Sequence, residues 1–423
     1  MGEFQHMKVG FIRKSEKPDS VVHMYAIAAQ HYGIEFFYFT PERINIKSKT
    51  IKALFVVNGN FVEKETPYPD IIDNIGFLRT QYNELYMDLA KACLFCHVSI
   101  GGKFEINNIV KDTDYAIETM LYNQSDIERL LDQYKQLVLK PNRSNQAKNI
   151  YRLYRSDDGL LCLQLKDNII KLSREAFTEK FHDQFSEKYI VSPYIKSVTS
   201  AGSPLNVRVL MLRGKGGDWE MMKLVPRIGI SGTIVANISA GSSIAYAREF
   251  FPMEFGDDAK KVIDDIKLCA LTLADLIQEN YSRLIPLLGF DIGIDRNNGN
   301  KPKFFEVNTG AGIRPYELET VEPILNFYKY LYENIDKYFE IQNTYLRIEG
   351  NRIINNTVES KDLSYVRLLK IYGDCVNKLQ INIRKNQFEL GKEIDSLKKA
   401  VNAEFHHVNL YMEYLAGLKN LEK

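Results

Sequence analysis

Residues 289–309 read GFDIGIDRNNGNKPKFFEVNT, and this stretch decides the fold of the chain. Two apolar-rich runs flank residues 296–302, which are rich in turn-forming types, so the stretch predicts a β-hairpin. Side chains alternate along a strand, and antiparallel pairing can therefore bring Asp291, Glu306 and Asn308 to one surface of the hairpin.

Two carboxylates and a carboxamide are hard oxygen donors, which suit a Mg²⁺ ion that carries a nucleotide's phosphates. The alternative is a solvated hairpin whose acidic groups face water. The acidic residues have apolar neighbours in the sequence, namely Ile292, Ile294, Phe304, Phe305 and Val307. These neighbours indicate a buried sheet, where an unpaired carboxylate would be costly, so the pattern favours the metal site.

Length and composition set limits on the function. A chain of 423 residues predicts two to four domains around a substantial core. Lys and Arg number 55 against 54 Asp and Glu, so the net charge of +1 creates no general attraction for nucleic acid or an acidic membrane. No apolar run approaches the roughly 18 residues that span a bilayer, and no export signal is recognisable. Five cysteines make no disulfide framework, so we expect a cytoplasmic protein.

The run from Cys93 to His97 has the spacing C-x-x-C-H, which attaches haem in c-type cytochromes. Covalent haem attachment of that kind requires export, and the surrounding residues read as an apolar helix end that runs into a strand. A haem or zinc site is therefore the minor alternative to a structural role.

The N-terminal part predicts a small α/β domain over residues 7–105. A helix is expected at about residues 19–32, and strands are expected at residues 8–13, 35–40, 51–57 and 70–76. Strands that alternate with helical stretches are typical of a parallel sheet. The first strand is followed by no G-x-G-x-x-G, so the domain lacks the dinucleotide-binding signal.

The remainder predicts three further parts. Residues 106–195 contain successive short strands of a small lobe, and residues 196–340 contain further strands, a long helix at 257–280 and the hairpin. Residues 345–423 are expected to begin with a hairpin, 345–349 with 352–356, around Gly350-Asn351. Residues 362–421 carry a long apolar stripe at helical spacing, which predicts a module that forms a homodimer or docks a partner, with packing on the chain's own body as the alternative.

Several of these features together resemble the ATP-grasp superfamily, most closely the endospore-coat-associated ATP-grasp proteins of the YheC/YheD type. Lys140 ends a strand of the small lobe, and residues 192–195 have the place of a hinge strand. Asn206-Val207-Arg208 follows, and then Arg227, Asn237, Gly241 and the metal hairpin. The closer match rests on residues 69–75, on 118–121 leading into 139–141, and on 237–241. The resemblance covers roughly residues 8–336.

The resemblance implies an ATP-grasp fold of mixed α/β and α+β class. Its parts would be an N-terminal α/β pre-ATP-grasp domain, a two-lobed nucleotide-binding domain and a C-terminal helical extension. It also implies a carboxylate–amine ligase that uses ATP and Mg²⁺, forms an acylphosphate and releases ADP and phosphate. The substrates would be a small-molecule or peptide carboxylate and an amine.

The resemblance also implies roles for particular residues. Lys140 would steady the α- and β-phosphates, and Lys111 is a loosely matched second contact. Arg208 and Arg227 would stabilise the transferring phosphoryl group as catalytic residues. Asp291, Glu306 and Asn308 would hold Mg²⁺. The other nucleotide contacts would be Val191, Ser192, Tyr194 and Asn237, and the substrate contacts Gly310, Gly312 and Arg314.

Three departures from the family pattern keep other functions open. The phosphate-covering loop, residues 142–149, contains no glycine, so fewer backbone amides can approach a phosphate. Ser192 stands where an acid or glutamine is usual, and Asn206 stands where the spore-coat type has aspartate. A degenerate nucleotide-binding scaffold, such as a coat or accessory protein, is therefore the main alternative to a ligase. A kinase-like use of the same site is a third hypothesis.

Overall fold

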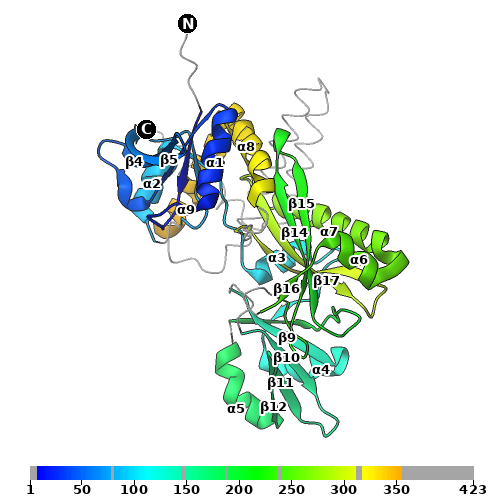
Figure 1. Ribbon diagram of the computed structural model, residues 1–423. Helices are drawn as coiled ribbons and strands as arrows, with labels where there is room; N and C mark the ends of the chain where they lie inside the picture. The colour runs from blue at the N-terminus through cyan, green and yellow to red at the C-terminus, as the bar shows by residue number, and fades with distance from the viewer. Residues whose placement is uncertain are drawn as a thin grey trace, which may run out of the picture. The chain divides into compact units, whose positions relative to one another are not determined.

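The computed structural model describes residues 7–77, 81–143, 149–186, 188–236, 241–310 and 317–354 (Figure 1). The chain divides into two compact units, 1–343 and 344–423, and the site described below lies in the first. Among the helices of the described part, none combines the length and apolar character that a membrane crossing needs.

The first domain is built on a sheet with the strand order β3-β4-β2-β1-β6-β7. Its strands are β1 (Met7–Ile12), β2 (Ile34–Phe39), β3 (Ile44–Asn45), β4 (Thr50–Val57), β5 (Asn60–Pro67), β6 (Ile71–Asp73) and β7 (Leu94–Phe95). Strands β2, β1, β6 and β7 are parallel, as predicted. Helix α1 (Ser20–His31) starts where the Asp19 side chain accepts a hydrogen bond from the Val22 N–H.

One part of that prediction is wrong, because β4 runs antiparallel to β2 and pairs with the unpredicted strand β5. Asn58 and Gly59 have φ angles of 51° and 77°, which is the left-handed backbone of a two-residue hairpin turn. This Asn-Gly pair joins β4 to β5 as a hairpin. Between β2 and β4 the chain has only the 3-10 turn η1 (Pro41–Arg43) and β3, which leaves no length for the helix that a parallel crossover would require.

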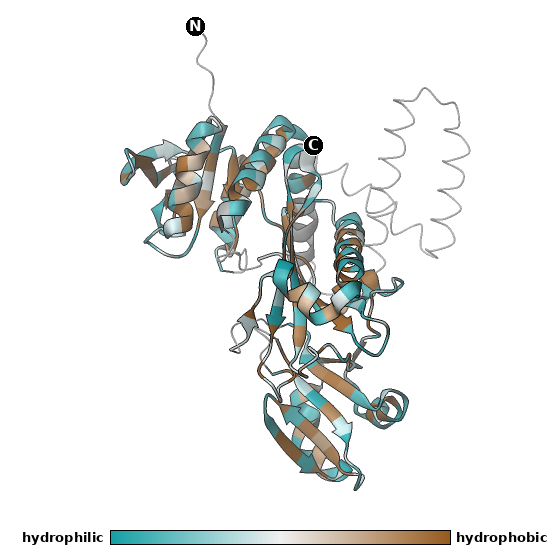
Figure 2. Cartoon of the chain, turned by 45° about the vertical axis from the view of Figure 1, so that its right-hand side comes forward, coloured by the Kyte–Doolittle hydropathy of each residue, from teal (hydrophilic) through white to brown (hydrophobic). Residues whose placement is uncertain are grey.

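A helix from much later in the chain completes the core of this domain. Helix α8 (Glu317–Glu333) lies beside α1 in Figure 1, and its Leu325 and Tyr328 share one apolar cluster with Val22 and Tyr25 of α1. Helix α2 (Asn83–Ala92) connects β6 to β7. The polar and apolar colours on these helices in Figure 2 are those expected of amphipathic helices that cover a sheet.

The small lobe is an antiparallel sheet in the order β12-β11-β10-β9-β13-β8, covered by α4 (Ile127–Tyr134) and α5 (Arg174–Phe185). Its strands are β8 (Met120–Leu121), β9 (Gln136–Pro141), β10 (Tyr151–Arg155), β11 (Leu161–Leu165), β12 (Asn168–Leu172) and β13 (Tyr189–Pro193). The short antiparallel strands predicted for this region are confirmed.

The large lobe has the strand order β16-β15-β14-β17-β18. Its strands are β14 (Leu205–Arg213), β15 (Trp219–Ile228), β16 (Ser243–Ile244), β17 (Leu287–Asp295) and β18 (Lys301–Asn308). One face packs on α3 (Lys103–Val110), α6 (Ala247–Phe255) and α7 (Ala259–Glu279), where Phe290 and Ile292 of β17 meet Ile266 and Leu273 of α7. The predicted hairpin is confirmed as β17 and β18.

The hairpin predicted at 345–356 is wrong over its described part, because α9 (Ile335–Ile354) continues through it. Gly350 and Asn351 were read as a turn, yet a glycine inside a helix costs only about 1 kcal/mol relative to alanine. The residues before it, 346–349, are Leu, Arg, Ile and Glu, most of them good helix formers. The helical stripe at 362–421 lies outside the described residues.

Candidate functional site

The hairpin places the three predicted metal ligands together. Asp291 of β17 lies directly opposite Glu306 of β18, and Gly289 lies opposite Asn308. Residues opposite each other on paired strands project to the same face, so Asn308 is a diagonal neighbour of Asp291 on that face. The pairing expected from the alternation of side chains is therefore present.

A β-bulge at Phe305 changes the hairpin just beside these residues. The register steps from Asp291 opposite Glu306 to Ile292 opposite Phe304, which leaves Phe305 as the extra residue. The Phe305 ring lies over Gly293, where an added Cβ would stand only 2.1 Å from the ring. The Phe305 carbonyl oxygen accepts a hydrogen bond from Lys140 Nζ at 2.9 Å. The bulge thus joins a lysine of the small lobe to the hairpin of the large lobe.

Asp291 is buried and held by two arginines. Arg208 of β14 donates to both carboxylate oxygens, from Nε to Oδ1 at 2.7 Å and from Nη2 to Oδ2 at 3.0 Å. Arg227 of β15 donates from Nη1 to Oδ1 at 3.2 Å. Burial alone would lower the pKa of Arg208, but the charge and hydrogen bonds of Asp291, together with the charge of Glu306, raise that pKa. Sequence reasoning assigned these arginines and Asp291 to different roles, and the structure brings them into one cluster.

Two lysines approach the hairpin. Lys103, at the start of α3, places its Nζ 3.4 Å from Glu306 Oε1. Burial lowers the pKa of Lys140 to about 8, and Lys103 adds to this effect while Glu306 opposes it. Lys103 was missed by sequence reasoning. The signal in the sequence is Gly101-Gly102 directly before it, a glycine pair at a helix start; the phosphate-covering loop was predicted at residues 142–149 instead.

A cavity of about 530 Å³ opens beside the hairpin. Its walls come from the segment before α3, from α3, from the end of β9 and from β18. It is lined by Ser99, Ile100, Gly101, Gly102, Lys103, Ile106, Asn107, Asn142, Arg143, Phe304, Phe305, Glu306, Val307 and Asn308. The cavity therefore presents Glu306 and Asn308 together with a lysine.

The other predicted nucleotide contacts lie elsewhere. Lys111 is exposed beyond the C-terminal end of α3 and does not line the cavity. Val191 and Ser192 are buried in β13, and the Tyr194 N–H donates to the Gln136 carbonyl at 3.0 Å. Because the Tyr194 N–H already donates to Gln136, an adenine base would have to bind other backbone groups.

The predicted substrate contacts are described only in part. Gly310 is in the structure, and a Cβ added there would stand 3.8 Å from Ile75, close to the end of β6. Gly312 and Arg314 lie outside the described residues, and so does Asn237, the remaining predicted nucleotide contact.

Comparisons with known proteins agree with this architecture. Residues 94–335 match the family described as YheC/D like ATP-grasp. The endospore coat-associated protein YheD of Bacillus subtilis (strain 168) is 22% identical over 296 residues, which cover 65% of this chain and 64% of YheD. The chain thus spans less than two thirds of that relative's length. The endospore coat-associated protein YheC of the same strain is 22% identical over 299 residues, 63% of this chain and 77% of YheC.

Among solved structures, D-cycloserine synthetase DcsG superposes with a TM-score of 0.47 at 9% identity and covers 76% of this chain and 99% of its own. The family match is independent of this weak likeness and spans the end of the first domain, both lobes and α8. The two lobes are each built on an antiparallel sheet, and the cavity beside them is lined by Lys103 and Glu306. The chain belongs to the YheC/D-like ATP-grasp family and has the ATP-grasp fold.

Proposed function

We propose that the protein is an ATP-dependent carboxylate–amine ligase that works with Mg²⁺ through an acylphosphate and releases ADP and phosphate. The observation that carries this proposal is the pairing of Asp291 with Glu306, beside Asn308, at a cavity of about 530 Å³ with Lys103 in its wall. The substrates would be a small-molecule or peptide carboxylate and an amine.

The donor set at the hairpin fits Mg²⁺. Asp291 accepts two hydrogen bonds at Oδ1 and one at Oδ2, so a lone pair of Oδ2 remains for an ion. Glu306 contacts Lys103 through Oε1, and Asn308 adds a neutral oxygen at the cavity wall. One or two carboxylates, completed by phosphate and water oxygens, are the usual protein contribution to such a site. The ion would supply charge neutralisation between the phosphates when bound.

The charges around the hairpin fit a polyanion. Lys103 pairs with Glu306, Arg208 and Arg227 pair with Asp291, and Lys140 donates to the Phe305 carbonyl beside them. These four cations against two carboxylates leave a surplus of two positive charges, which would attract the negative charge of a nucleotide's phosphates. With a pKa of about 8, Lys140 is mostly protonated at neutral pH and can serve as a point charge for phosphate. Asp291 keeps both guanidiniums oriented beside the proposed metal position.

A screen of ATP consumption tests the proposal. The full chain would be incubated with ATP, Mg²⁺ and pools of amino acids and peptides, and the release of ADP would be scored against that of AMP. Glu306→Gln is the matched inactive variant, because it removes one ligand charge at the cavity and keeps the side-chain shape. Pool-dependent ADP release that disappears in Glu306→Gln supports the ligase. AMP as the product, or equal rates in both proteins, would refute it.

A non-catalytic nucleotide-binding scaffold is the second candidate. It is favoured by the absence of glycine from residues 142–149 and by the printed names of YheD and YheC, which are described as endospore coat-associated. Calorimetry with Mg²⁺ and a non-hydrolysable ATP analogue separates the two. Binding of the analogue without ATP consumption in any pool would favour the scaffold.

The proposal has three further parts, which concern the substrate contacts, the cellular compartment and the assembly of the protein. Gly310, Gly312 and Arg314 are proposed to contact a substrate, because they follow the hairpin directly. The cytoplasm is the proposed compartment, since the described cysteines Cys93, Cys96, Cys162 and Cys269 are free thiols. Residues 362–421 are proposed to form a homodimer or to dock a partner. Light scattering of the full chain against a chain ending at residue 359 tests this, and an equal monomer mass for both would contradict it.

A further inference from the structure

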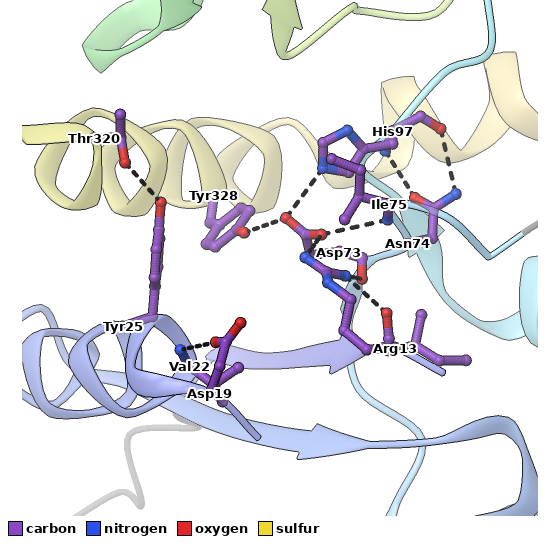
Figure 3. A network of polar contacts seen from close by, with 11 residues as sticks. Arg13, Asp19, Val22, Tyr25, Asp73, Asn74, Ile75, His97, Thr320 and Tyr328 are labelled. Carbon is purple, nitrogen blue, oxygen red and sulfur yellow. Dashed lines mark hydrogen bonds and ion pairs between the residues drawn. The ribbon is translucent and has the colours of Figure 1, made fainter. Parts of the chain in front are cut away.

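A buried carboxylate at the end of β6 joins three separate parts of the first domain (Figure 3). Asp73, which is only 4% exposed, accepts hydrogen bonds from Arg13 Nη2 at 2.9 Å, from His97 Nε2 at 3.1 Å and from the Tyr328 hydroxyl at 2.7 Å. Arg13 follows β1, His97 follows β7, and Tyr328 belongs to α8. We call these four residues the Asp73 hub.

The hub does not have the chemistry of a metal centre, although Cys96, His97 and Asp73 have ligand atoms within 4.8 Å of one another. A cysteine binds zinc as its thiolate, whereas burial raises the pKa of the Cys96 thiol well above its usual value. The permanently charged guanidinium of Arg13 also pairs with Asp73, and its positive charge would repel a metal cation there. This geometry gives no support to the haem or zinc alternative for the C-x-x-C-H motif.

What distinguishes His97 from the other members of the hub is the chain that follows it. Residues 98–102 have no regular secondary structure and lead directly to Lys103, and residues 99–103 line the cavity. The backbone of His97 is fixed as well, because the Asn74 side chain accepts from the His97 N–H at 2.7 Å and donates to its carbonyl at 3.4 Å. One end of the segment is therefore anchored by His97.

The other end of the segment is anchored in the small lobe. The Lys103 N–H donates to the Asn142 carbonyl at 3.1 Å, and the Phe104 N–H donates to Asn142 Oδ1 at 2.8 Å. The Gly101 N–H donates to the Tyr281 hydroxyl at 2.9 Å. The segment between the two anchors, residues 98–102, is short, so it has little freedom while both hold, and loss of the anchor at His97 would leave it held at one end and free to open locally.

We propose that His97 is a positioning residue for the nucleotide site: the Asp73 hub and Asn74 fix the start of residues 98–102 and thereby hold Lys103 against Glu306 at the cavity wall. This inference rests on the proposed function, in that it takes the cavity to be the nucleotide site. Tyr328 bonds the same carboxylate oxygen as His97 but lies within α8 and is not followed by the cavity segment, so it belongs to the hub without sharing this role.

Two measurements test the inference on the full chain. Hydrogen exchange of the amides of Gly101, Lys103 and Phe104 in the nucleotide-free protein reports whether the segment is held. Calorimetry with Mg²⁺ and a non-hydrolysable ATP analogue reports the affinity of the cavity for the analogue, which falls if Lys103 is displaced. The variants are His97→Ala, Asn74→Ala, the conservative His97→Gln, which keeps an N–H donor, and Tyr328→Phe as the matched control. All are compared below their melting temperatures.

We expect His97→Ala and Asn74→Ala to speed exchange of these amides and to weaken analogue binding about 10-fold, the usual cost of losing a residue that orients a ligand-binding group. His97→Gln should recover most of the affinity, and Tyr328→Phe should stay within about twofold of the native protein. Unchanged exchange in both alanine variants, or an equal loss of affinity in Tyr328→Phe, would overturn the inference. A native protein that binds no analogue would refute the proposed function, and the exchange data would still decide the role of His97.

Discussion

The substitution Asp291→Asn should destabilise the folded protein, which a water-facing metal ligand would not do. It removes the counter-charge of Arg208 and one partner of Arg227, whose contacts to Asp291 measure 2.7, 3.0 and 3.2 Å. Breaking one side of a buried ion pair costs about 3–5 kcal/mol. The entropy of unfolding is about 2.1 cal/mol/K per residue, so a cooperative unit spanning residues 1–343 would lose roughly 4–7 °C in melting temperature.

Differential scanning calorimetry without nucleotide or divalent ion measures this loss. Glu306→Gln is the matched control, because it removes one carboxylate from the position opposite Asp291. Glu306 is partly exposed at the cavity and contacts Lys103 at 3.4 Å, a contact worth about 1 kcal/mol or less, so its melting temperature should fall by no more than about 2 °C. Equal melting temperatures for Asp291→Asn and the native protein would refute the reasoning, as would equal losses in the two variants.

Three other predictions follow from the same structure. Lys140→Ala should weaken binding of the ATP analogue by about 1.5–3 kcal/mol. Because the pKa of Lys140 is about 8 in the free protein, analogue binding at about pH 8.5 should also take up a proton, which calorimetry in buffers of different ionisation enthalpy detects. Proton uptake that persists in the variant would count against this lysine. Burial alone would raise the pKa of Asp73, but the charges of His97 and Arg13 hold that pKa well below its usual range. The ionised carboxylate therefore stabilises the fold fully above the unfolded pKa of about 3.9, and this stabilisation is lost as the pH falls. The melting temperature should drop less steeply from about pH 6 to pH 3 for Asp73→Asn than for the native protein, and an equal drop in both would contradict this. Gly293→Ala should lower the free energy of unfolding by about 1–3 kcal/mol through overpacking, since the new Cβ would meet the Phe305 ring. Adding Phe305→Leu to the same chain should recover part of the loss in thermal melting. A single variant as stable as the native protein would show that the ring can move aside without cost.

The elements that could be predicted from the sequence are those that local patterns determine. The β17–β18 hairpin follows from two apolar runs around a segment rich in turn formers, and the strict alternation of side chains then places Asp291 beside Glu306. The small lobe is likewise a series of short strands separated by turns. Both depend on residues that are close together in the sequence.

The features that were missed depend on contacts between distant residues. Residues 317–333 were assigned to the large lobe with no helix predicted there, but they form α8, whose apolar side chains pack with α1, a contact that only the fold can show. Lys103 reaches Glu306 because residues 98–102 cross from the first domain to the hairpin. The bulge at Phe305 has no sequence signal beyond Gly293, whose missing side chain makes room for the ring. Asp291 was assigned to metal alone, because its arginine partners come from other strands.

The hold of Arg208 and Arg227 on Asp291 also has a consequence for the order in which ligands arrive. A divalent ion that diffuses in alone meets a carboxylate whose charge is already balanced, with further cations nearby, and gains little by leaving water. A nucleotide that already carries its ion brings the negative charge that the arginines and lysines can meet. We therefore expect metal and nucleotide to enter as one complex, with the nucleotide-free protein remaining metal-free at divalent ion concentrations that saturate the nucleotide itself.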